Sequence, residues 1–217
     1  MTKVKPSTLR LGIVEMGRLG EIALRVVAAN LQAVLGIEVD FLGPHEVPEN
    51  AYQAHRQQFD AGLILKHLSG CAFPKYPRIL ALTNLDLCIP ILTYVFGEAE
   101  MGGRAAVVSG FRLRHNEDGT AVSIDRYYER LAKVALHEVA HTLSLYHCEE
   151  SLCLMHFSSK VGQLDKLHIL FCERCAFMLQ TSLRNLAEEF ASRHRKKPVK
   201  SDKQKAREAR PGPSLRS

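Results

Sequence analysis

Two histidines and a glutamate stand together at a spacing that suits metal-dependent chemistry. The run His137-Glu138-Val139-Ala140-His141 places two imidazoles four residues apart. On a helix they share one face and can bind one zinc ion from adjacent turns. Glu138 can then take a proton from zinc-bound water, whose pKa the metal lowers towards about 7, and deliver it to a leaving amine. Two ordinary surface histidines would give the same five letters.

A third histidine argues against coincidence. His147 follows His141 by six residues, so the helix must end near Leu143 and the chain must bend back to bring His147 to the metal. Three neutral nitrogen ligands leave a fourth position open for water, which is the arrangement of a catalytic zinc rather than a structural one. The spacing therefore predicts a catalytic zinc site.

Four cysteines next to this motif predict a second site. The pairs Cys148-x4-Cys153 and Cys172-x2-Cys175 offer four thiolates, enough for a closed tetrahedral zinc site without room for substrate. We expect this structural zinc to fasten the chain just after His147 to the start of the last helix. Buried free thiols that only pack are the alternative, since the spacing alone does not require a metal.

The N-terminal residues indicate the cellular compartment, and the compartment in turn indicates the state of the remaining two cysteines. The first residues lack the apolar stretch and small-residue cleavage site of a secretory signal. We therefore expect a cytoplasmic protein, in which cysteines stay reduced. For Cys71 and Cys88, buried free thiols are the preferred interpretation.

The histidine motif must lie on a helix, which the pattern predicts over residues 124–143. Ser123 suits its N-cap. Apolar residues recur at helical spacing along one stripe: Tyr128, Leu131, Ala135, Val139 and Leu143.

The remaining elements predict a single α/β domain. Apolar and alternating runs predict strands at residues 9–14, 37–42, 78–83, 92–96 and 105–114, and helical periodicity predicts helices at 21–35, 51–68 and 173–192. The strands at 78–83 and 92–96 are apolar enough to be buried on both faces, and the strand at 105–114 alternates as expected near a sheet edge. Glycines at 12, 17 and 20 do not match the dinucleotide-binding spacing and indicate a strand-to-helix turn.

The charge of the chain is concentrated at one end. The net charge is +6, with 46% hydrophobic residues. Residues 193–217 hold ten Lys or Arg against two acidic residues, so residues 1–192 carry 19 basic and 21 acidic side chains, a net −2. We predict one folded domain at 1–192 and a basic tail at 193–217 that is disordered or helical in part. A slightly acidic domain argues against specific nucleic-acid binding, and no apolar run reaches membrane-spanning length.

These motifs together resemble the archaemetzincins, a branch of the metzincin zinc peptidases. The run from His137 through His147, with cysteines at 148 and 153 and Met155 following, carries the resemblance, and Cys172-x2-Cys175 completes it. Residues 95–99 and 106–109 are similar to that family as well, so the resemblance extends to about residue 192.

The resemblance implies a fold and a set of roles. It implies an α/β, metzincin-like fold with a mixed, mostly parallel twisted sheet, an antiparallel edge strand, an active-site helix and a horizontal cleft. It divides the domain into subdomains at 1–143 and 144–192. It assigns the three histidines to a catalytic zinc, Glu138 to the general base and the four cysteines to a structural zinc. Met155 would form a methionine turn beneath the metal, and the strand of Val107 and Val108 would be the edge strand that holds an extended peptide.

The sequence departs from the family at two points. Ser144 stands where the family has glycine, at a sharp turn where a positive φ would strain serine by about 1–3 kcal/mol. No tyrosine follows Tyr146, so the tyrosine with which some metzincins stabilise the oxyanion has no counterpart. His156 or His168 could take this role, but a histidine in such a position is more often an ordinary surface residue, so we assign the role to neither.

Three functions follow from these observations. We favour a zinc-dependent peptidase that binds two Zn²⁺ per chain, takes peptides or proteins as substrates and acts as a monomer. A zinc-stabilised protein that binds peptides with little or no hydrolysis is the alternative, suggested by Ser144 and the missing oxyanion donor. A zinc-ribbon nucleic-acid binder is the third, disfavoured because the cysteines are interleaved with the histidine motif.

Overall fold

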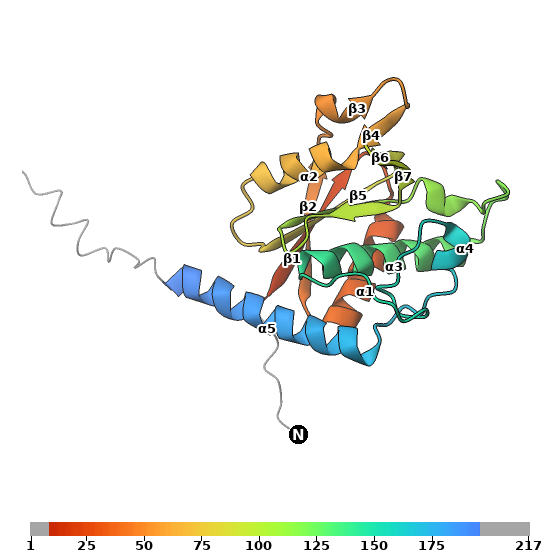
Figure 1. Cartoon of the computed structure of the whole chain (residues 1–217). Coiled ribbons are helices and arrows are strands. Elements are labelled where there is room, and N and C mark those ends of the chain that lie inside the picture. Colours follow the sequence, from red (N-terminus) through yellow and green to blue (C-terminus); the bar gives the residue numbers. More distant parts are fainter. Residues whose placement is uncertain (1–8, 196–217) are drawn as a thin grey trace, which may run out of the picture.

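A five-stranded sheet forms the centre of the chain, which a computed structural model describes over residues 9–195. The strand order is β2-β1-β5-β9-β8, with four parallel strands and β8 antiparallel at one edge (Figure 1). The strands are β1 (Arg10–Met16), β2 (Glu38–His45), β5 (Arg78–Thr83), β8 (Gly97–Ala99) and β9 (Ala105–Ser109). The predicted mixed, mostly parallel sheet with an antiparallel edge strand is confirmed.

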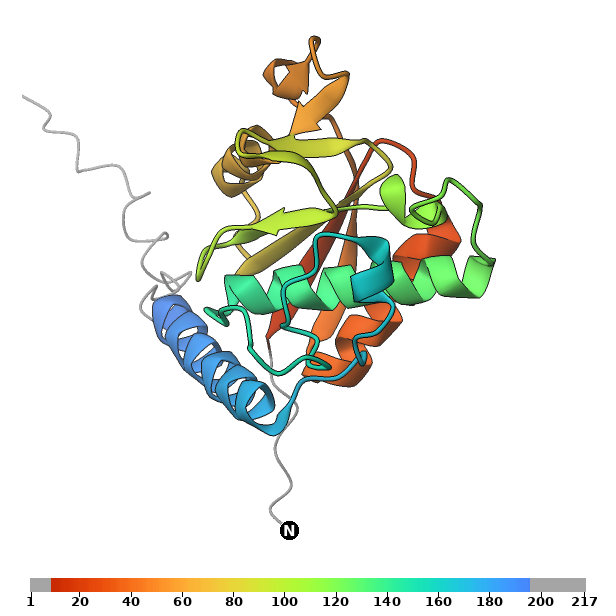
Figure 2. The same cartoon turned by 45° about the vertical axis from the view of Figure 1, so that its right-hand side comes forward.

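Helices cover both faces of this sheet. The helices α1 and α3 lie on one face and α2 lies on the other, while α5 runs along the base of the molecule (Figures 1 and 2). The helices are α1 (Glu21–Leu35), α2 (Ala61–Gly70), α3 (Ile124–Thr142), α4 (Val161–Leu164) and α5 (Glu173–Arg195). Two apolar clusters fill the layers, one around α1, α3 and the start of α5, the other between α2 and the sheet.

A second, four-stranded sheet projects above the first. Its order is β3-β4-β6-β7, from β3 (Tyr52–Gln53), β4 (Gln58–Asp60), β6 (Leu87–Ile89) and β7 (Leu92–Val95). The prediction of one helix over residues 51–68 is wrong, because residues 52–60 form the β3–β4 hairpin. The Asp60 carboxylate accepts the Leu63 N–H and so caps α2, which therefore begins at Ala61. The strand β7 lies at the edge of this sheet and is partly exposed rather than buried on both faces.

The edge strand of the main sheet differs from the predicted one. Val107 and Val108 lie on β9, which pairs with β5 on one side and with β8 on the other, and every residue of β9 is buried. On this side of the sheet the edge is the three-residue strand β8, so the assignment of Val107 and Val108 to a substrate-binding edge is wrong. The predicted strand also ends at Ser109, and Arg112–Arg114 form a short 3₁₀ helix.

One buried arginine anchors α3 beside the sheet. Arg130 is 1% exposed, and its five N–H groups have acceptors. They donate to both carboxylate oxygens of Asp165 at 2.8 and 2.7 Å, to the carbonyls of Leu113 and His115, and to the side chain of Asn116. The ion pair joins α3 to the end of α4. This network fixes the helix that carries the histidine motif.

Two further predictions concern the basic tail and a membrane-spanning segment. The helix α5 continues to Arg195, so the first residues assigned to the basic tail are helical; the rest of that tail lies outside the described residues. Within residues 9–195, no helix is both long enough and apolar enough to cross a lipid bilayer.

Candidate active site

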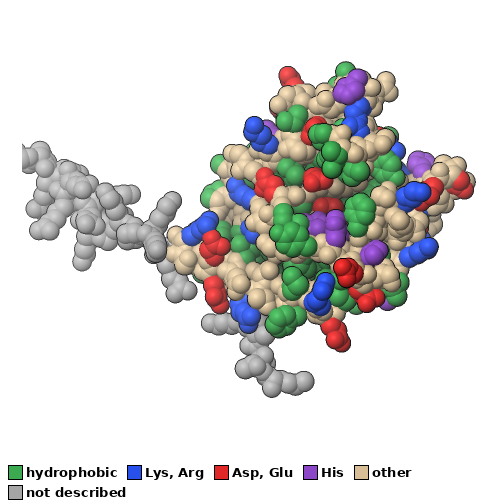
Figure 3. Space-filling view, in the orientation of Figure 1, with side chains coloured by type: hydrophobic (Ala, Val, Ile, Leu, Met, Phe, Trp, Pro, Cys, Tyr) green, Lys and Arg blue, Asp and Glu red, His purple; other side chains and the backbone are tan. Residues whose placement is uncertain are grey.

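The predicted histidine ligands come together at the C-terminal end of α3. The ligand atoms of His137, His141 and His147 lie within 4.8 Å of one another. Figure 3 shows histidine side chains gathered in the middle of one face, between hydrophobic ones. Each of the first two rings is held by a backbone carbonyl: His137 Nδ1 lies 2.8 Å from Leu154 O, and His141 Nδ1 lies 2.7 Å from Leu145 O. A carbonyl oxygen only accepts, so both Nδ1 atoms carry protons and donate.

The opposite nitrogens of these two rings face each other with lone pairs. His137 Nε2 and His141 Nε2 are 3.0 Å apart. Burial, followed by the neighbouring His141, lowers the pKa of His137 to about 3, so the ring is neutral. Two acceptors at this separation repel unless a cation lies between them. Two nitrogens on one tetrahedral zinc would be about 3.3 Å apart, so the donor set fits that ion.

A tight turn after α3 brings in the third histidine. Ser144 N–H donates to His141 O at 3.0 Å, and Leu145 N–H donates to Ala140 O at 3.1 Å. This pair of bonds is the Schellman ending of a helix, which needs a left-handed residue at the position of Ser144. Ser144 has a φ of 66°, so the turn is made by a serine in the conformation that favours glycine. His147 then sits beside the other rings, with the Phe157 ring 5.1 Å away.

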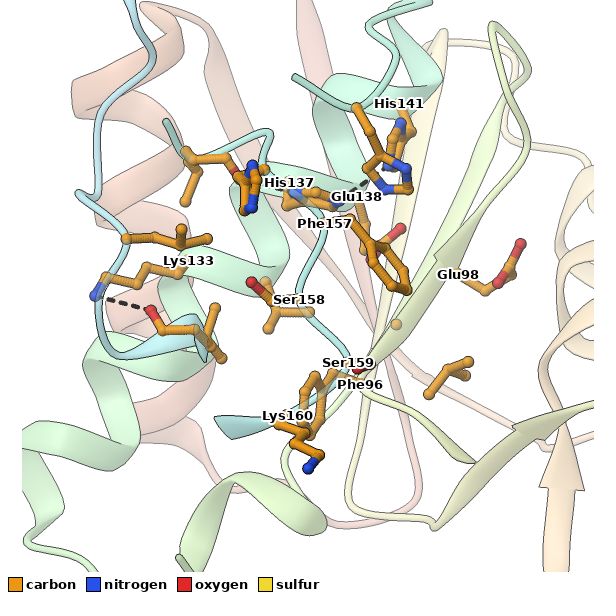
Figure 4. A pocket seen from close by; sticks show the side chains of 18 of the residues that line it. Phe96, Glu98, Lys133, His137, Glu138, His141, Phe157, Ser158, Ser159 and Lys160 are labelled. Carbon is orange, nitrogen blue, oxygen red and sulfur yellow. Dashed lines mark hydrogen bonds between the residues drawn. The ribbon is translucent and has the colours of Figure 1, made fainter. Parts of the chain in front are cut away.

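Glu138 lies beside the histidines and against the edge strand. Its side chain is 8% exposed and lines the same cleft as the three imidazoles (Figure 4). Burial, with a smaller contribution from Glu98, raises the pKa of Glu138 well above its usual range. A Cβ atom on Gly97 would come 2.6 Å from Glu138 Cγ and 2.9 Å from Val107 O. The glutamate therefore fits only because residue 97 has no side chain.

The four predicted cysteines also come together. The sulfurs of Cys148, Cys153, Cys172 and Cys175 lie within 4.8 Å of one another, and the Cys148 and Cys172 sulfurs are 3.8 Å apart. This distance is too long for a disulfide and equals the edge of a tetrahedral zinc–thiolate site, about 3.8 Å. Cys153 Sγ accepts backbone N–H groups from Met155 and Cys172, at 3.4 and 3.3 Å. Burial raises the pKa of the Cys153 and Cys175 thiols, whereas a backbone hydrogen bond from Cys175 lowers the pKa of Cys172. A bound cation would favour the thiolate form of all of them.

Met155 is adjacent in the chain to contacts with both clusters. Its side chain is fully buried, and it follows Leu154, whose carbonyl holds His137. Cys148 N–H donates to Met155 O at 2.8 Å, which pairs the two segments that flank the cysteine cluster.

The cleft around the histidines has a volume of about 490 Å³ and is bounded on two sides. Residues 92–99, here the upper rim, comprise β7, Phe96 and β8. Residues 157–160, here the lower segment, face them (Figure 4). His156 lines the cleft, and its Nδ1 is hydrogen-bonded to Cys148 O. His168 is not among the residues that line it.

Two contributors to the site were not predicted from the sequence. Gly97 gives no signal, because a glycine in a short strand has many explanations. Tyr94 donates its hydroxyl to Ser159 O at 3.0 Å, a contact between residues 65 positions apart that no local pattern indicates.

The chain is similar to known zinc peptidases along most of its length. The model of Peptidase family M54 matches residues 35–181. An archaemetzincin of Archaeoglobus fulgidus is 36% identical over 153 residues, which cover 70% of this chain and 88% of that protein. The crystal structure of an archaemetzincin from Methanopyrus kandleri has a TM-score of 0.74 and 34% identity, covering 84% of this chain and 99% of that one.

The chain is also similar in structure to a protein known as a zinc-dependent peptidase. A zinc-dependent peptidase from Methanocorpusculum labreanum has a TM-score of 0.69 and 25% identity, and the match covers 78% of this chain and 99% of that one. The resemblance read from the motifs is confirmed, and the chain belongs to peptidase family M54, the archaemetzincins, as a zinc-dependent metallopeptidase.

Proposed function

We propose that His137, His141 and His147 hold the catalytic zinc ion and that Glu138 is the general base for peptide-bond hydrolysis. The observation that carries this proposal is the pair of Nε2 lone pairs 3.0 Å apart, each fixed by a carbonyl on the other side of its ring. A zinc ion bound there polarises a substrate carbonyl and lowers the pKa of water.

Glu138 moves the proton in this proposal. Its carboxylate takes a proton from the attacking water and delivers it to the leaving amine, so one residue is base and then acid. Its place beside the ligands and its burial in the cleft support this role. A protein that only bound peptides would have no use for a glutamate beside an open metal position, which favours hydrolysis over the binding-only alternative.

We propose that the four cysteines hold a second, structural zinc, for a total of two Zn²⁺ per chain. Four thiolates complete a tetrahedral set and leave no position for substrate. Met155 then has a supporting role, as an apolar residue packed behind the segment that holds His137.

An extended peptide would bind along β8. Phe96 and Glu100, the residues that flank β8, turn their backbone groups towards β9. The Phe96 carbonyl accepts the Ser109 N–H, and the Glu100 N–H donates to Ala105 O. In an antiparallel ladder the intervening Gly97 and Ala99 turn theirs the other way. Their N–H and C=O groups are available for strand addition by substrate.

Metal content and turnover together test these assignments. We expect two zinc ions per purified chain, one in His141→Ala, and two in Glu138→Gln. Glu138→Gln should lose about 10²- to 10⁴-fold in kcat for peptide hydrolysis that a chelator stops in the unaltered protein. A single zinc in both the unaltered protein and His141→Ala would refute the catalytic site. Undiminished turnover by Glu138→Gln would refute the base.

A further inference from the structure

A glutamate without a partner lies on the upper rim of the cleft. Glu98 is the middle residue of β8, lines the cleft and is half-buried. Within residues 9–195, its carboxylate has no hydrogen bond and no ion pair. Burial raises the pKa of this carboxyl, so a cation that enters the cleft would stabilise its negative charge.

Glu98 and Glu138 lie on opposite sides of β8. A Cβ atom on Gly97 would point at Glu138 Cγ, and the side chains of successive strand residues alternate between the two faces. Glu98 is paired with Val107, whose side chain belongs to the apolar cluster between α2 and the sheet. In Figure 4 the Glu98 carboxylate accordingly points away from Glu138 and the labelled histidines. Glu98 therefore lies outside the proposed zinc chemistry but on the rim along which substrate would pair.

The ladder decides which substrate side chain would meet Glu98. The backbone groups of Gly97 and Ala99 face the open edge, so Glu98 occupies the position between two sets of hydrogen bonds to substrate. Directly opposed residues at such a position have Cα atoms about 4.5 Å apart and carry their side chains on the same face. The substrate side chain opposite Glu98 would therefore extend alongside its carboxylate rather than towards the zinc.

The direction of the substrate places this side chain before the cleaved bond. Gly97 lies against Glu138, the proposed base, so the bond to be cleaved lies opposite Gly97. A peptide paired antiparallel with β8, the more stable arrangement, runs in the direction from Ala99 to Gly97. The residue opposite Glu98 is therefore the first or the second residue before the cleaved bond.

The cations that line the cleft do not neutralise Glu98. The Lys133 ammonium is paired with Glu129 at 2.6 Å, and Lys160 lies on the lower segment, away from Glu98 in Figure 4. Opposite charges directly across a pair of strands attract, and like charges repel. A lysine or arginine of the substrate would supply the missing cation, whereas an aspartate or glutamate there would be repelled.

We propose that this peptidase prefers substrates with lysine or arginine at the first or second position before the cleaved bond, and that Glu98 selects them. The inference rests on the proposed function for the place of cleavage and for the pairing of substrate with β8, and it adds the class of substrate. Glu98 acts here as a specificity residue and takes no part in the chemical step.

Cleavage of peptides by the zinc-loaded full chain provides the first test. A pool of mixed-sequence peptides is digested, and the cleaved bonds are identified by mass spectrometry. We expect Lys and Arg to be enriched, and Asp and Glu to be depleted, at the first or second position before the bond. In a well-cleaved sequence, replacing that basic residue by Gln should lower kcat/KM about tenfold, the effect of one hydrogen bond between charged groups. Moving the basic residue to the end of the same peptide should lower kcat/KM equally, although the net charge is unchanged.

Variants of Glu98 test whether this carboxylate causes the preference. Glu98→Gln should bring the Lys and Gln peptides within about twofold of each other, and Glu98→Lys should favour an acidic residue at the same position. Glu46→Gln is the matched control, because Glu46 is exposed and outside the cleft, and it should keep the full difference. The zinc content of each variant shows whether the metal sites are intact.

Binding provides a readout that does not depend on turnover. The zinc-loaded Glu138→Gln variant is immobilised and offered the same pool, and the retained peptides are sequenced. We expect several-fold enrichment of Lys and Arg, lost when Glu98→Gln is added and kept when Glu46→Gln is added. Such enrichment without cleavage by the unaltered chain would refute the proposed function and leave this inference standing. Cleavage without preference for a basic residue, or an equal preference in Glu98→Gln, would overturn the inference and leave the proposed function intact.

Discussion

His147 and Cys148 are consecutive residues that belong to two different clusters of metal-binding side chains. One peptide bond therefore joins the proposed catalytic zinc site to the proposed structural one. The same coupling recurs at Leu154 and Met155: the carbonyl of Leu154 holds the His137 ring, and the N–H of Met155 donates to Cys153 Sγ. The cysteine cluster thus supports His147 through the adjoining peptide bond. It supports His137 through the hydrogen bond to the Leu154 carbonyl.

This coupling predicts an asymmetry between the two metals. Cys175→Ser should lose the structural zinc and also weaken the catalytic one by about 10- to 100-fold in affinity, the usual effect of removing outer support from a ligand. His141→Ala should lose only the catalytic zinc, because none of the four cysteines lies on α3. Zinc content of each variant during titration with a chelator measures both sites. Unchanged affinity of the catalytic site in Cys175→Ser would contradict the coupling.

Ser144 is predicted to reduce stability. Its φ of 66° costs a residue with a Cβ atom about 1 kcal/mol, which glycine avoids. Ser144→Gly should raise the unfolding midpoint by about 2–4 °C for a chain of this size. Ser144→Ala keeps the Cβ atom and is the matched control, for which we expect no gain. Equal midpoints for Ser144→Gly and Ser144→Ala in thermal scans would show that the backbone of this turn is not strained.

Gly97→Ala should impair catalysis without removing metal. The added Cβ atom would lie 2.6 Å from Glu138 Cγ, so the glutamate or β8 must move. Displacement of a catalytic group by about 1 Å costs on the order of 100-fold, which we expect in kcat/KM at unchanged zinc content. Gly70→Ala, at the end of α2 with no atom near the new methyl group, is the control. Full activity of Gly97→Ala would show that the contact can relax at no cost.

The Arg130–Asp165 pair predicts a pH dependence of stability. The hydrogen bonds from Arg130 lower the pKa of Asp165 below its usual value. The contribution of the ionised Asp165 to the free energy of unfolding is therefore fully present above the unfolded-state pKa of about 3.9. It is lost as the pH falls through the lower folded-state pKa. Asp165→Asn should destabilise the protein by about 2–3 kcal/mol near pH 7, because it leaves the buried Arg130 charge without compensation.

The difference between Asp165→Asn and the unaltered chain should shrink as the pH falls below about 4. Denaturant unfolding of both proteins at each pH measures it, and loss of zinc in acid affects both alike. Asp118→Asn, in the exposed turn before α3, should change the midpoint much less. A difference between the two proteins that stays constant from pH 7 to pH 3 would contradict the ionic origin of the effect.

The sequence predicts elements well where local signals agree. Residues 21–35 form α1 with the predicted bounds, because the helical period of apolar residues ends at Gly36, which has a φ of 66°. The start of α3 is likewise correct, since the Ser123 hydroxyl accepts the Arg126 N–H at the predicted cap. The clustering of His137 and His141 was also predicted from spacing alone, because side chains four residues apart on a helix share a face without tertiary information.

The errors occur where position depends on distant partners. The order of strands in a sheet is not encoded in any one strand, so β9 has the pattern of an edge and lies inside, while the true edge β8 is too short to give a signal. The hairpin of residues 52–60 is held by Arg56, which donates to the carbonyls of residues 89, 92 and 93. Such contacts between remote segments override the local helical pattern.

The contact between Gly97 and Glu138 also constrains how related chains can vary. A side chain at position 97 and a glutamate at position 138 exclude each other in this backbone, since the new Cβ atom meets both the glutamate and the Val107 carbonyl. The two positions should therefore change together. A homologue without a glutamate at position 138 is free to accept a larger residue in the edge strand, and one that retains glycine at position 97 has kept the space that the proposed base requires.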